Sequence, residues 1–411
     1  MKIIMLLRYI YIFAIPIVDV MSFSPLMPIP LIVGCIILIS SRRIIYDKGD
    51  LYILATIFFT LIPYVWSLEY VGIKTLYHVI ALLGSVIVYY LITKTTIREI
   101  CSKGKVETLI NVICWSLIFS SVYIVIEYTL NNLFGINIDT FIPHLARVDY
   151  GASVLDDILR ARGFATESGV MAIYYEMYFF ILVGLQKLYQ LTVRPTRLIN
   201  AALIFSSISL IFLFSTASIL VLFFGFLVLI TRQGISLKWI SACGVIFSLF
   251  VFVFSDQISY FIENTFLNKI AIFYSSDTIG SARERTEIYN ENFNVFMNFP
   301  LGIGHGIAPE VSEQNSLYFG HSILAGQVSL FLLFLVSGGV FSLFFFILWI
   351  ANKLRQCQRG ILKNYVTASF ISIVAHFTLV SEYWLPFFWV SMALYSEIYF
   401  VENKLLNDKR R

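Results

Sequence analysis

Residues 198–230, with the sequence LINAALIFSSISLIFLFSTASILVLFFGFLVLI, decide the fold class of this chain. The run is too long for one ordinary membrane helix, which needs about 20 apolar residues, and the polar stretch STAS at 215–218 divides it. Basic residues flank the run on both sides: Arg194, Arg197, Arg232 and Lys238. Because Lys and Arg favour the cytoplasmic side of a membrane, both flanks belong on that side. The run therefore predicts two membrane crossings joined by a tight turn.

The composition excludes an ordinary soluble protein. The 411 residues are 59% hydrophobic and 13% charged, whereas soluble domains are about 25% charged. Apolar segments of spanning length recur along the chain and predict an all-α polytopic membrane protein with about twelve transmembrane helices. We expect one helical bundle over residues 1–411. The candidate spans are 3–19, 24–40, 51–68, 75–93, 108–130, 168–186, 198–214, 217–231, 239–255, 323–351, 364–382 and 383–401.

Loops between the spans are alternately rich and poor in Lys and Arg, and this alternation predicts the orientation. With a cytoplasmic N-terminus, 22 of the 29 basic residues fall on the cytoplasmic side. They are Lys2, Arg8, Arg42, Arg43, Lys48, Lys94, Arg98, Lys103, Lys105, Lys187, Arg194, Arg197, Arg232, Lys238, Lys353, Arg355, Arg359, Lys363, Lys404, Lys409, Arg410 and Arg411. We therefore expect both termini in the cytoplasm. Nucleic acid is not an expected partner, because the basic residues lie in short loops rather than on one continuous face.

Two large loops on the opposite side depart from this alternation. Residues 131–167 and 256–322 are expected outside the cytoplasm, yet both carry arginine pairs. The arginines are Arg160, Arg162, Arg283 and Arg285. Guanidinium groups stay charged and bind phosphate oxygens through two hydrogen bonds at once. Arginines at this membrane face are therefore suited to a diphosphate.

The second loop contains a predicted amphipathic helix over 281–297. Its apolar residues share one helical stripe: Tyr289, Phe293, Phe296 and Met297. Arg285 lies one turn before Tyr289 on this stripe, whereas Arg283 falls on the polar side. Pro300 ends the helix.

A glycine-rich turn follows the proline. Gly302, Gly304 and Gly306 surround His305 and allow the backbone to approach a ligand or another segment closely. His321 lies at the mouth of the next apolar run, 323–351. We expect that run to form one long helix, bent near Ser337-Gly338-Gly339.

Neither a metal ion nor another cofactor is expected. The sequence contains no Asp-x-Asp pattern, and the adjacent pair Asp156-Asp157 is a poor substitute for it. Without a metal, arginines would neutralise a departing diphosphate. Structural alternatives remain for these residues. Arg160 and Arg162 could form surface ion pairs with Asp156, Asp157 or Glu167, Arg285 could be an interfacial residue that snorkels, and His305 and His321 could bond neighbouring groups.

Several ionisable residues lie within or at the ends of predicted spans, where such groups are functional hypotheses by default. The glutamates are Glu127, Glu176, Glu382 and Glu397. Glu176 is the most interesting because it lies about two turns into the span that follows Arg160 and Arg162. We expect His376, also inside a span, to bond a neighbouring helix, and we interpret His78 and His144 as incidental.

The second loop resembles a known family. Arg285-Thr-Glu-Ile-Tyr289, followed by Pro300-Leu-Gly302-Ile-Gly304, resembles the Arg-x-x-x-Trp … Pro-x-x-Gly-x-Gly signature of the O-antigen ligase and polymerase superfamily. Arg160-Ala-Arg162-Gly163-Phe164 resembles the Arg-x-x-Gly-aromatic element of that family. His321-Ser322 is similar to its His-Asn element. Tyr289 stands where the family has Trp, and Ser322 stands where it has Asn.

The resemblance covers about residues 155–350 and implies a GT-C-like membrane fold and a glycosyltransferase activity. The expected function is an O-antigen (surface polysaccharide) polymerase at the periplasmic face of the bacterial inner membrane. Its implied partners are undecaprenyl-diphosphate-linked oligosaccharide, membrane lipids and a chain-length regulator protein. The resemblance also implies that four arginines bind the diphosphate: Arg160, Arg162, Arg283 and Arg285. His321 and Arg285 are then the catalytic residues, with His305, Glu176 and Tyr289 near the substrate.

Two alternatives stay open. An O-antigen ligase would transfer finished polysaccharide to lipid A–core. A flippase for lipid-linked oligosaccharide belongs to another functional class, and transporters commonly carry internal repeats and discontinuous helices. We find no internal repeat in this sequence.

Overall fold

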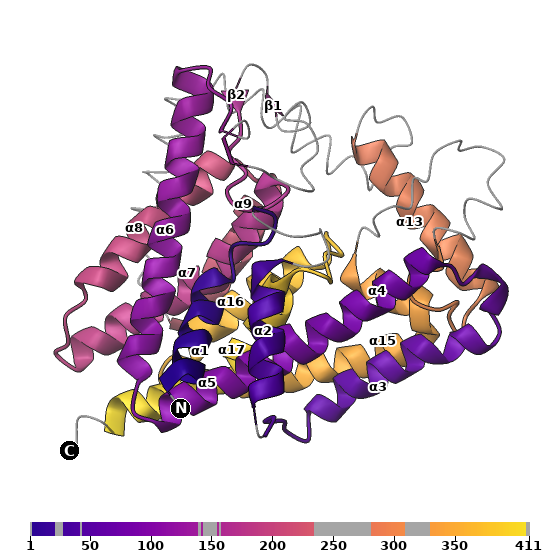
Figure 1. Cartoon of the computed structure of the whole chain (residues 1–411), viewed down its shortest axis with the longest axis horizontal. Coiled ribbons are helices and arrows are strands. Elements are labelled where there is room, and N and C mark those ends of the chain that lie inside the picture. The colour runs from indigo at the N-terminus through magenta and orange to yellow at the C-terminus, as the bar shows by residue number, and fades with distance from the viewer. Residues whose placement is uncertain are drawn as a thin grey trace.

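The computed structural model describes residues 2–20, 28–41, 43–138, 141–142, 154–155, 158–233, 281–308 and 329–407, which form a bundle of helices (Figure 1). The α-helices are α1 (Lys2–Ala14), α2 (Ile29–Ser40), α3 (Asp50–Leu61), α4 (Ile73–Gly84), α5 (Thr93–Ser102), α6 (Val106–Leu133), α7 (Ser168–Leu191), α8 (Arg197–Leu213), α9 (Thr216–Gln233), α13 (Ser281–Asn298), α15 (Leu330–Cys357), α16 (Lys363–His376) and α17 (Pro386–Asn407). Shorter or wider helical turns are η1 (Ile62–Val65), η2 (Leu68–Tyr70) and the π-helix η3 (Ser85–Ile92). One short antiparallel hairpin pairs β1 (Val154–Leu155) with β2 (Ile158–Leu159).

The helices differ in direction: α6 stands steeply in Figure 1, whereas α3, α4 and α15 lie closer to its horizontal axis. The start of α1 and the end of α17 lie at one end, whereas the β1–β2 hairpin and α13 lie at the other (Figure 1). We call the second of these the distal end. Helix α7 lies inside the bundle and packs against α8, α9, α16 and α17. Residues 158–167 and helix α13, which belong to the two predicted loops, thus lie on one side of the molecule.

The apolar helices agree with a helical membrane protein. Within the described residues, four helical stretches are long and apolar enough to cross a bilayer: Ile73–Ser102 (α4, η3 and α5 together), α6, α7 and α15. Shorter apolar helices include α2, α8 and most of α9. The total of about twelve crossings stays a prediction.

The predicted division of the 198–230 run is confirmed. Helix α8 ends at Leu213 and α9 begins at Thr216. Phe214 between them adopts a left-handed conformation with φ 43°, which side chains other than glycine rarely take. The Ser218 backbone N–H then lies 3.4 Å from Ser215 Oγ, so the serine caps the new helix.

The predicted bend of the long apolar helix is also confirmed. Gly339 interrupts α15 with φ 66° and ψ −164°. A Cβ atom at this position would lie only 2.4 Å from the Leu301 carbonyl carbon. Glycine is therefore needed for both the left-handed backbone and the close approach of the chain around Leu301.

The expected loop around Lys94 is wrong. The helix continues without a break from α4 through η3 to the end of α5 at Ser102, and Lys94 is fully buried within it. The positive-inside rule considers only the number of Lys and Arg residues in a loop and not the acidic residues that pair with them. Here Asp47 and Asp50 pair with Lys94, which lets the charged residue remain inside a helix.

The predicted helix in the second loop exists as α13, and its buried face differs in part from its apolar stripe. Phe293 and Met297 are exposed, at 53% and 63%. Among the described side chains of α13, from Ile288 onward, the buried ones are Ile288, Asn292 and Val295. Val295 packs with residues of the glycine-rich turn and α15. The buried face of α13 is therefore determined by these tertiary contacts rather than by the apolarity of its side chains alone.

Candidate functional site at the distal end

Residues 158–167, which we call the arginine segment, are held against α6 by two polar side chains. Glu127 Oε2 accepts hydrogen bonds from the backbone N–H groups of Arg162 (3.0 Å) and Gly163 (2.7 Å). The Asn132 amide donates to the Leu159 carbonyl and accepts from the Leu159 N–H, both at 2.8 Å. Glu127 thus satisfies backbone N–H groups that lie beyond the short β1–β2 pairing, and Asn132 binds the backbone of Leu159 at the end of β2.

Contacts from other helices complete the docking of this segment. The Phe164 ring stacks on Tyr123 with centroids 4.2 Å apart. The Phe164 carbonyl accepts the Asp19 N–H at 3.0 Å, and the Ala161 N–H donates to the Phe212 carbonyl at 3.3 Å. The arginine segment is therefore fixed between α6, the end of α8 and the chain that follows α1.

The two arginines of this segment differ in exposure. Arg162 is 1% exposed, whereas Arg160 is half-buried. Burial lowers the pKa of Arg160, and the nearby carboxylate of Glu167 opposes this effect. Asp156 and Asp157, the other proposed partners, lie outside the residues with described side chains. A guanidinium keeps its charge in proteins, so both residues supply partly desolvated positive charge at the distal end.

Residues 299–308, which we call the glycine turn, dock into the break of α15. The N–H groups of Ile303 and Gly304 donate to the carbonyls of Val336 (3.1 Å) and Ser337 (2.8 Å). Breaking a helix leaves such carbonyls without their usual partners. The glycine turn supplies those partners, and a Cβ atom at Gly302 (φ 92°) would lie 2.6 Å from the Ser337 oxygen.

Side chains around η1 bind the carbonyl groups of the same turn. Trp66 Nε1 donates to the Gly302 carbonyl at 3.0 Å, and Ser67 Oγ donates to the Ile303 carbonyl at 2.6 Å. The Tyr64 hydroxyl donates to the His305 carbonyl. Both backbone edges of the glycine turn are therefore occupied by protein groups.

His305 lies inside this contact at 1% exposure. Its Nδ1 is 3.4 Å from Ser337 Oγ, and its Nε2 has no hydrogen-bond partner within the described residues. Burial lowers the pKa of His305 to about 3, with a further contribution from the nearby His78. The imidazole is thus neutral near pH 7, as a buried group of this kind must be.

His78 packs beside the glycine turn, a contact that the sequence did not predict. Its Nδ1 lies 2.5 Å from the Tyr383 hydroxyl, and its ring meets the His305 ring edge to face at 6.2 Å. A Cβ atom at Gly306 would lie 2.8 Å from His78 Cβ. Three segments distant in sequence, which contain His78, His305 and Tyr383, therefore meet at the glycine turn.

Helix α13 carries Arg283 and Arg285 and lies at the same end of the bundle. The Tyr289 hydroxyl donates to the Thr378 carbonyl at 3.1 Å, which joins α13 to the chain after α16. The side chains of both arginines, and all of His321, lie outside the described part of the structure. Their convergence with Arg160 and Arg162 stays a prediction.

Glu176 and His376 come together in the interior of the bundle. His376 Nδ1 lies 2.8 Å from Glu176 Oε2, and both side chains are buried. The expectation that His376 bonds a neighbouring helix is confirmed, because the bond joins α16 to α7. The sequence indicated both residues separately, but their separation along the chain hides the pairing.

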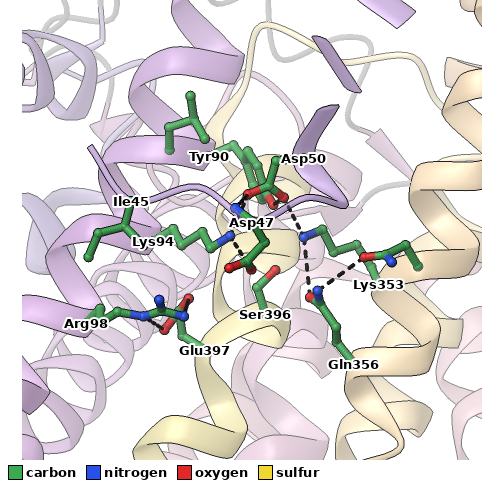
Figure 2. A network of polar contacts seen from close by, with 12 residues as sticks. Ile45, Asp47, Asp50, Tyr90, Lys94, Arg98, Lys353, Gln356, Ser396 and Glu397 are labelled. Atoms are coloured by element: carbon green, nitrogen blue, oxygen red, sulfur yellow. Dashed lines mark hydrogen bonds and ion pairs between the residues drawn. The ribbon is translucent and has the colours of Figure 1, made fainter. Parts of the chain in front are cut away.

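A second buried charge cluster, where the start of α3 meets α5 and α15, was missed by the sequence reasoning (Figure 2). Asp50 accepts hydrogen bonds from Lys94 Nζ (2.5 Å), from Lys353 Nζ (2.8 Å) and from the Tyr90 hydroxyl. Lys94 also contacts Asp47 at 2.6 Å. We call these five residues the Asp50 cluster. Beside it, two hydrogen bonds of 2.7 Å join the Arg98 and Glu397 side chains. In the sequence, the only indication of this cluster was the alternation of acidic and basic residues at a span boundary.

Comparison with known proteins yields no match to a protein-family model and no match to a curated protein sequence. Within the described residues, no group of three His, Cys, Asp or Glu side chains is arranged to hold a metal ion.

Proposed function

We propose that this protein is a membrane glycosyltransferase of the O-antigen polymerase type. It would join undecaprenyl-diphosphate-linked oligosaccharide repeat units at the periplasmic face of the inner membrane. In this proposal the chain crosses the membrane about twelve times, with both termini in the cytoplasm. The distal end then faces the periplasm.

One observation carries the proposal. The arginine segment and α13, which hold the arginines predicted to bind the diphosphate, lie at the same end of the bundle, away from the start of α1 (Figure 1). Arg162 is buried in a turn that α6 holds in place through Glu127. Fixed cations in a partly desolvated site stabilise a developing negative charge more strongly than cations in water.

The proposed reaction exchanges one bond at the anomeric carbon. A hydroxyl of the acceptor repeat unit attacks that carbon as the bond to the carrier diphosphate breaks. Arg160, Arg162, Arg283 and Arg285 would bind the departing diphosphate. His321 would activate the acceptor hydroxyl or contact the phosphates, and the donor's diphosphate bond provides the driving force.

The test is complementation of a strain that lacks the gene. Loss of a polymerase leaves core carrying a single repeat unit, whereas loss of a ligase leaves bare core and polymer on its carrier. Arg160→Ala and Arg285→Ala should shorten or abolish the polysaccharide, with Arg→Lys variants as controls that keep the charge but lose the bidentate geometry. If His321→Ala and Arg285→Ala both leave chain length and amount unchanged, the site assignment is wrong.

The topology can be tested separately. Single cysteines introduced into 131–167 and 256–322 should react with a membrane-impermeant thiol reagent from the periplasmic side. Labelling of both loops only after the inner membrane is opened would overturn the proposal.

A flippase is the second candidate because of the Asp50 cluster and the break in α15. Buried charges and discontinuous helices inside a bundle are typical of transporters. Purified protein supplied with lipid-linked repeat units separates the two functions. Only a polymerase makes higher oligomers, whereas a flippase moves the lipid across a vesicle membrane without extending it.

A further inference from the structure

The pair formed by Glu176 and His376 lies where α7 and α16 cross inside the bundle. The two side chains are 0% and 1% exposed, and they are joined by a hydrogen bond of 2.8 Å. An ionisable pair inside an apolar bundle has a large desolvation cost. Such groups within membrane helices usually mark a path for protons, ions or substrates.

The hydrogen-bonding capacity of this region is not filled. Glu176 Oε1 and Ser218 Oγ are both buried without a hydrogen-bond partner among the described residues. Ser372 Oγ donates to the Val221 carbonyl at 2.9 Å, which sets the register of the antiparallel helices α16 and α9. Ser218 and His376 each lie about one turn from that bond toward the distal end. Two polar atoms with unused capacity therefore lie at the level of the imidazole.

Holding the helices together does not require an ionisable pair here. Ser369 Oγ donates to the Met177 carbonyl at 2.8 Å and shares a hydrogen bond with the Tyr395 hydroxyl, also at 2.8 Å. These neutral bonds already join α16 to α7 and α17, in the manner common between membrane helices. The carboxylate and imidazole can thus accept and release a proton, an ability that helix packing does not require.

The pair lies between the two parts of the chain assigned to the diphosphate. Helix α7 begins at Ser168, directly after the arginine segment, and Glu176 lies about 12 Å along it. On the other side, Tyr289 of α13 bonds the carbonyl of Thr378, two residues beyond His376. The pair therefore lies between a helix that begins at the arginine segment and a segment that contacts α13.

The hydrogen bond fixes the chemistry of the imidazole. An ionised carboxylate can only accept, so Nδ1 of His376 must donate to Glu176, and the neutral ring then has its lone pair at Nε2. The carboxylate also stabilises the imidazolium that forms when Nε2 gains a proton. His376 is the last residue of α16, and the negative end of a helix dipole favours a cation in the last turn.

We propose that His376 is the general base of this protein and that Glu176 is its positioning residue. The inference rests on the proposed glycosyltransferase function and deepens it. Nε2 of His376 takes the proton from the acceptor hydroxyl as the oxygen bonds to the anomeric carbon. The bond from that carbon to the diphosphate breaks at the same time, and its electron pair leaves with the carrier diphosphate. The proton later passes to solvent, and His321 is left to contact the phosphates.

The pH dependence of the reaction rate would reflect the Glu176–His376 pair and the groups around it. Tyr395 of α17 interacts electrostatically with Glu176, and Ser218 of α9 brings no charge. A general base acts only in its unprotonated form, so the reaction rate should fall toward acid pH. Glu176→Gln keeps an acceptor for Nδ1 but removes the negative charge, so the imidazolium loses stabilisation. The acid limb of the profile should then differ from that of the wild-type protein.

The experiment measures oligomer formation by purified full-length protein from pH 5 to 9. The substrate is undecaprenyl-diphosphate-linked oligosaccharide extracted from a strain that lacks the gene. We expect His376→Gln to lower the rate about 10²–10⁴-fold and to flatten the acid limb. Glu176→Gln should lower the rate and shift the limb. Ser369→Ala is the matched control, since it removes a buried bond between α16 and α7 without a titratable group, and it should leave the profile unchanged.

Thermal unfolding in detergent shows which variants are folded, and profiles are compared only among those. A folded Glu176→Gln protein with the wild-type limb and rate overturns the proposal for the pair while leaving the proposed function standing. A shift of the limb by Ser369→Ala as large as that by Glu176→Gln also overturns it. Wild-type protein that forms no oligomer overturns the proposed function together with this inference.

Discussion

At the scale of single residues, Glu127 determines the shape of the arginine segment. Its carboxylate accepts two backbone N–H groups inside the bundle. Glu127→Ala would leave both groups buried without that acceptor, at a cost of about 2–4 kcal/mol in the free energy of unfolding. Glu127→Gln retains an acceptor oxygen and should lose much less. Thermal unfolding in detergent measures both, and equal losses for the two variants would contradict this role.

His305 predicts a dependence of stability on pH. Its pKa is lowered to about 3 in the folded protein, whereas an exposed histidine has a pKa of about 6.5. Between these values the unfolded chain binds more protons, so the contribution is complete above about pH 6.5 and is lost as the pH falls. The expected slope is up to about 1.4 kcal/mol per pH unit.

The measurement compares wild type with His305→Phe, which keeps an aromatic ring against Tyr383 but cannot titrate. Unfolding free energies from pH 7.5 to 4.5 should fall more steeply for wild type. Parallel curves would mean that His305 has the same pKa in the folded and unfolded protein, which would contradict this prediction.

At the scale of elements, the break in α15 depends on glycine. Gly339→Ala puts a Cβ atom 2.4 Å from the Leu301 carbonyl carbon, at a φ of 66°. We expect a loss of about 3 kcal/mol from backbone strain and the displaced turn. Gly104→Ala is the matched control, because its φ is 69° but no atom lies within 4 Å of the added carbon. It should cost about 1 kcal/mol. Similar unfolding midpoints for both variants would mean that the close contact between the glycine turn and Gly339 of α15 does not contribute to the loss of stability.

The elements that sequence predicts well are those with local signals. The division of the 198–230 run follows from its polar residues, and the bend in α15 follows from adjacent glycines. The continuous helix through Lys94 could not be predicted, because its burial depends on Asp47 and Asp50 in a different segment. The buried face of α13 likewise depends on its contact with α15.

The candidate site was likewise predictable from the sequence only where the signal is local. Arginines, glycines and intramembrane acids are visible in the sequence as residue types. The pairing of Glu176 with His376, and the support that Glu127 gives to Arg162, join residues far apart in the chain. Those contacts depend on helix packing, which no local pattern encodes.

At the scale of the whole molecule, the Asp50 cluster ties together α3, α5 and α15 (Figure 2). Asp50→Asn would leave Lys353 buried without its carboxylate, and we expect a loss of about 3–5 kcal/mol. Glu107→Gln is the control, since Glu107 pairs with Arg194 but is 60% exposed, and it should cost at most about 1 kcal/mol.

A double variant tests the cause of that loss. Asp50→Asn with Lys353→Met removes the unpaired charge and should recover part of the stability in the same unfolding assay. No recovery would indicate that the carboxylate, rather than an uncompensated lysine, determines the effect.

The docking of the arginine segment also has a consequence for biogenesis. Its backbone bonds reach back to Asp19 and forward to Phe212. During translation, the turn that holds Arg162 therefore cannot reach its final shape until α8 has left the ribosome and inserted. A nascent chain arrested before α8 should still expose this turn to an added protease, whereas the finished protein should protect it.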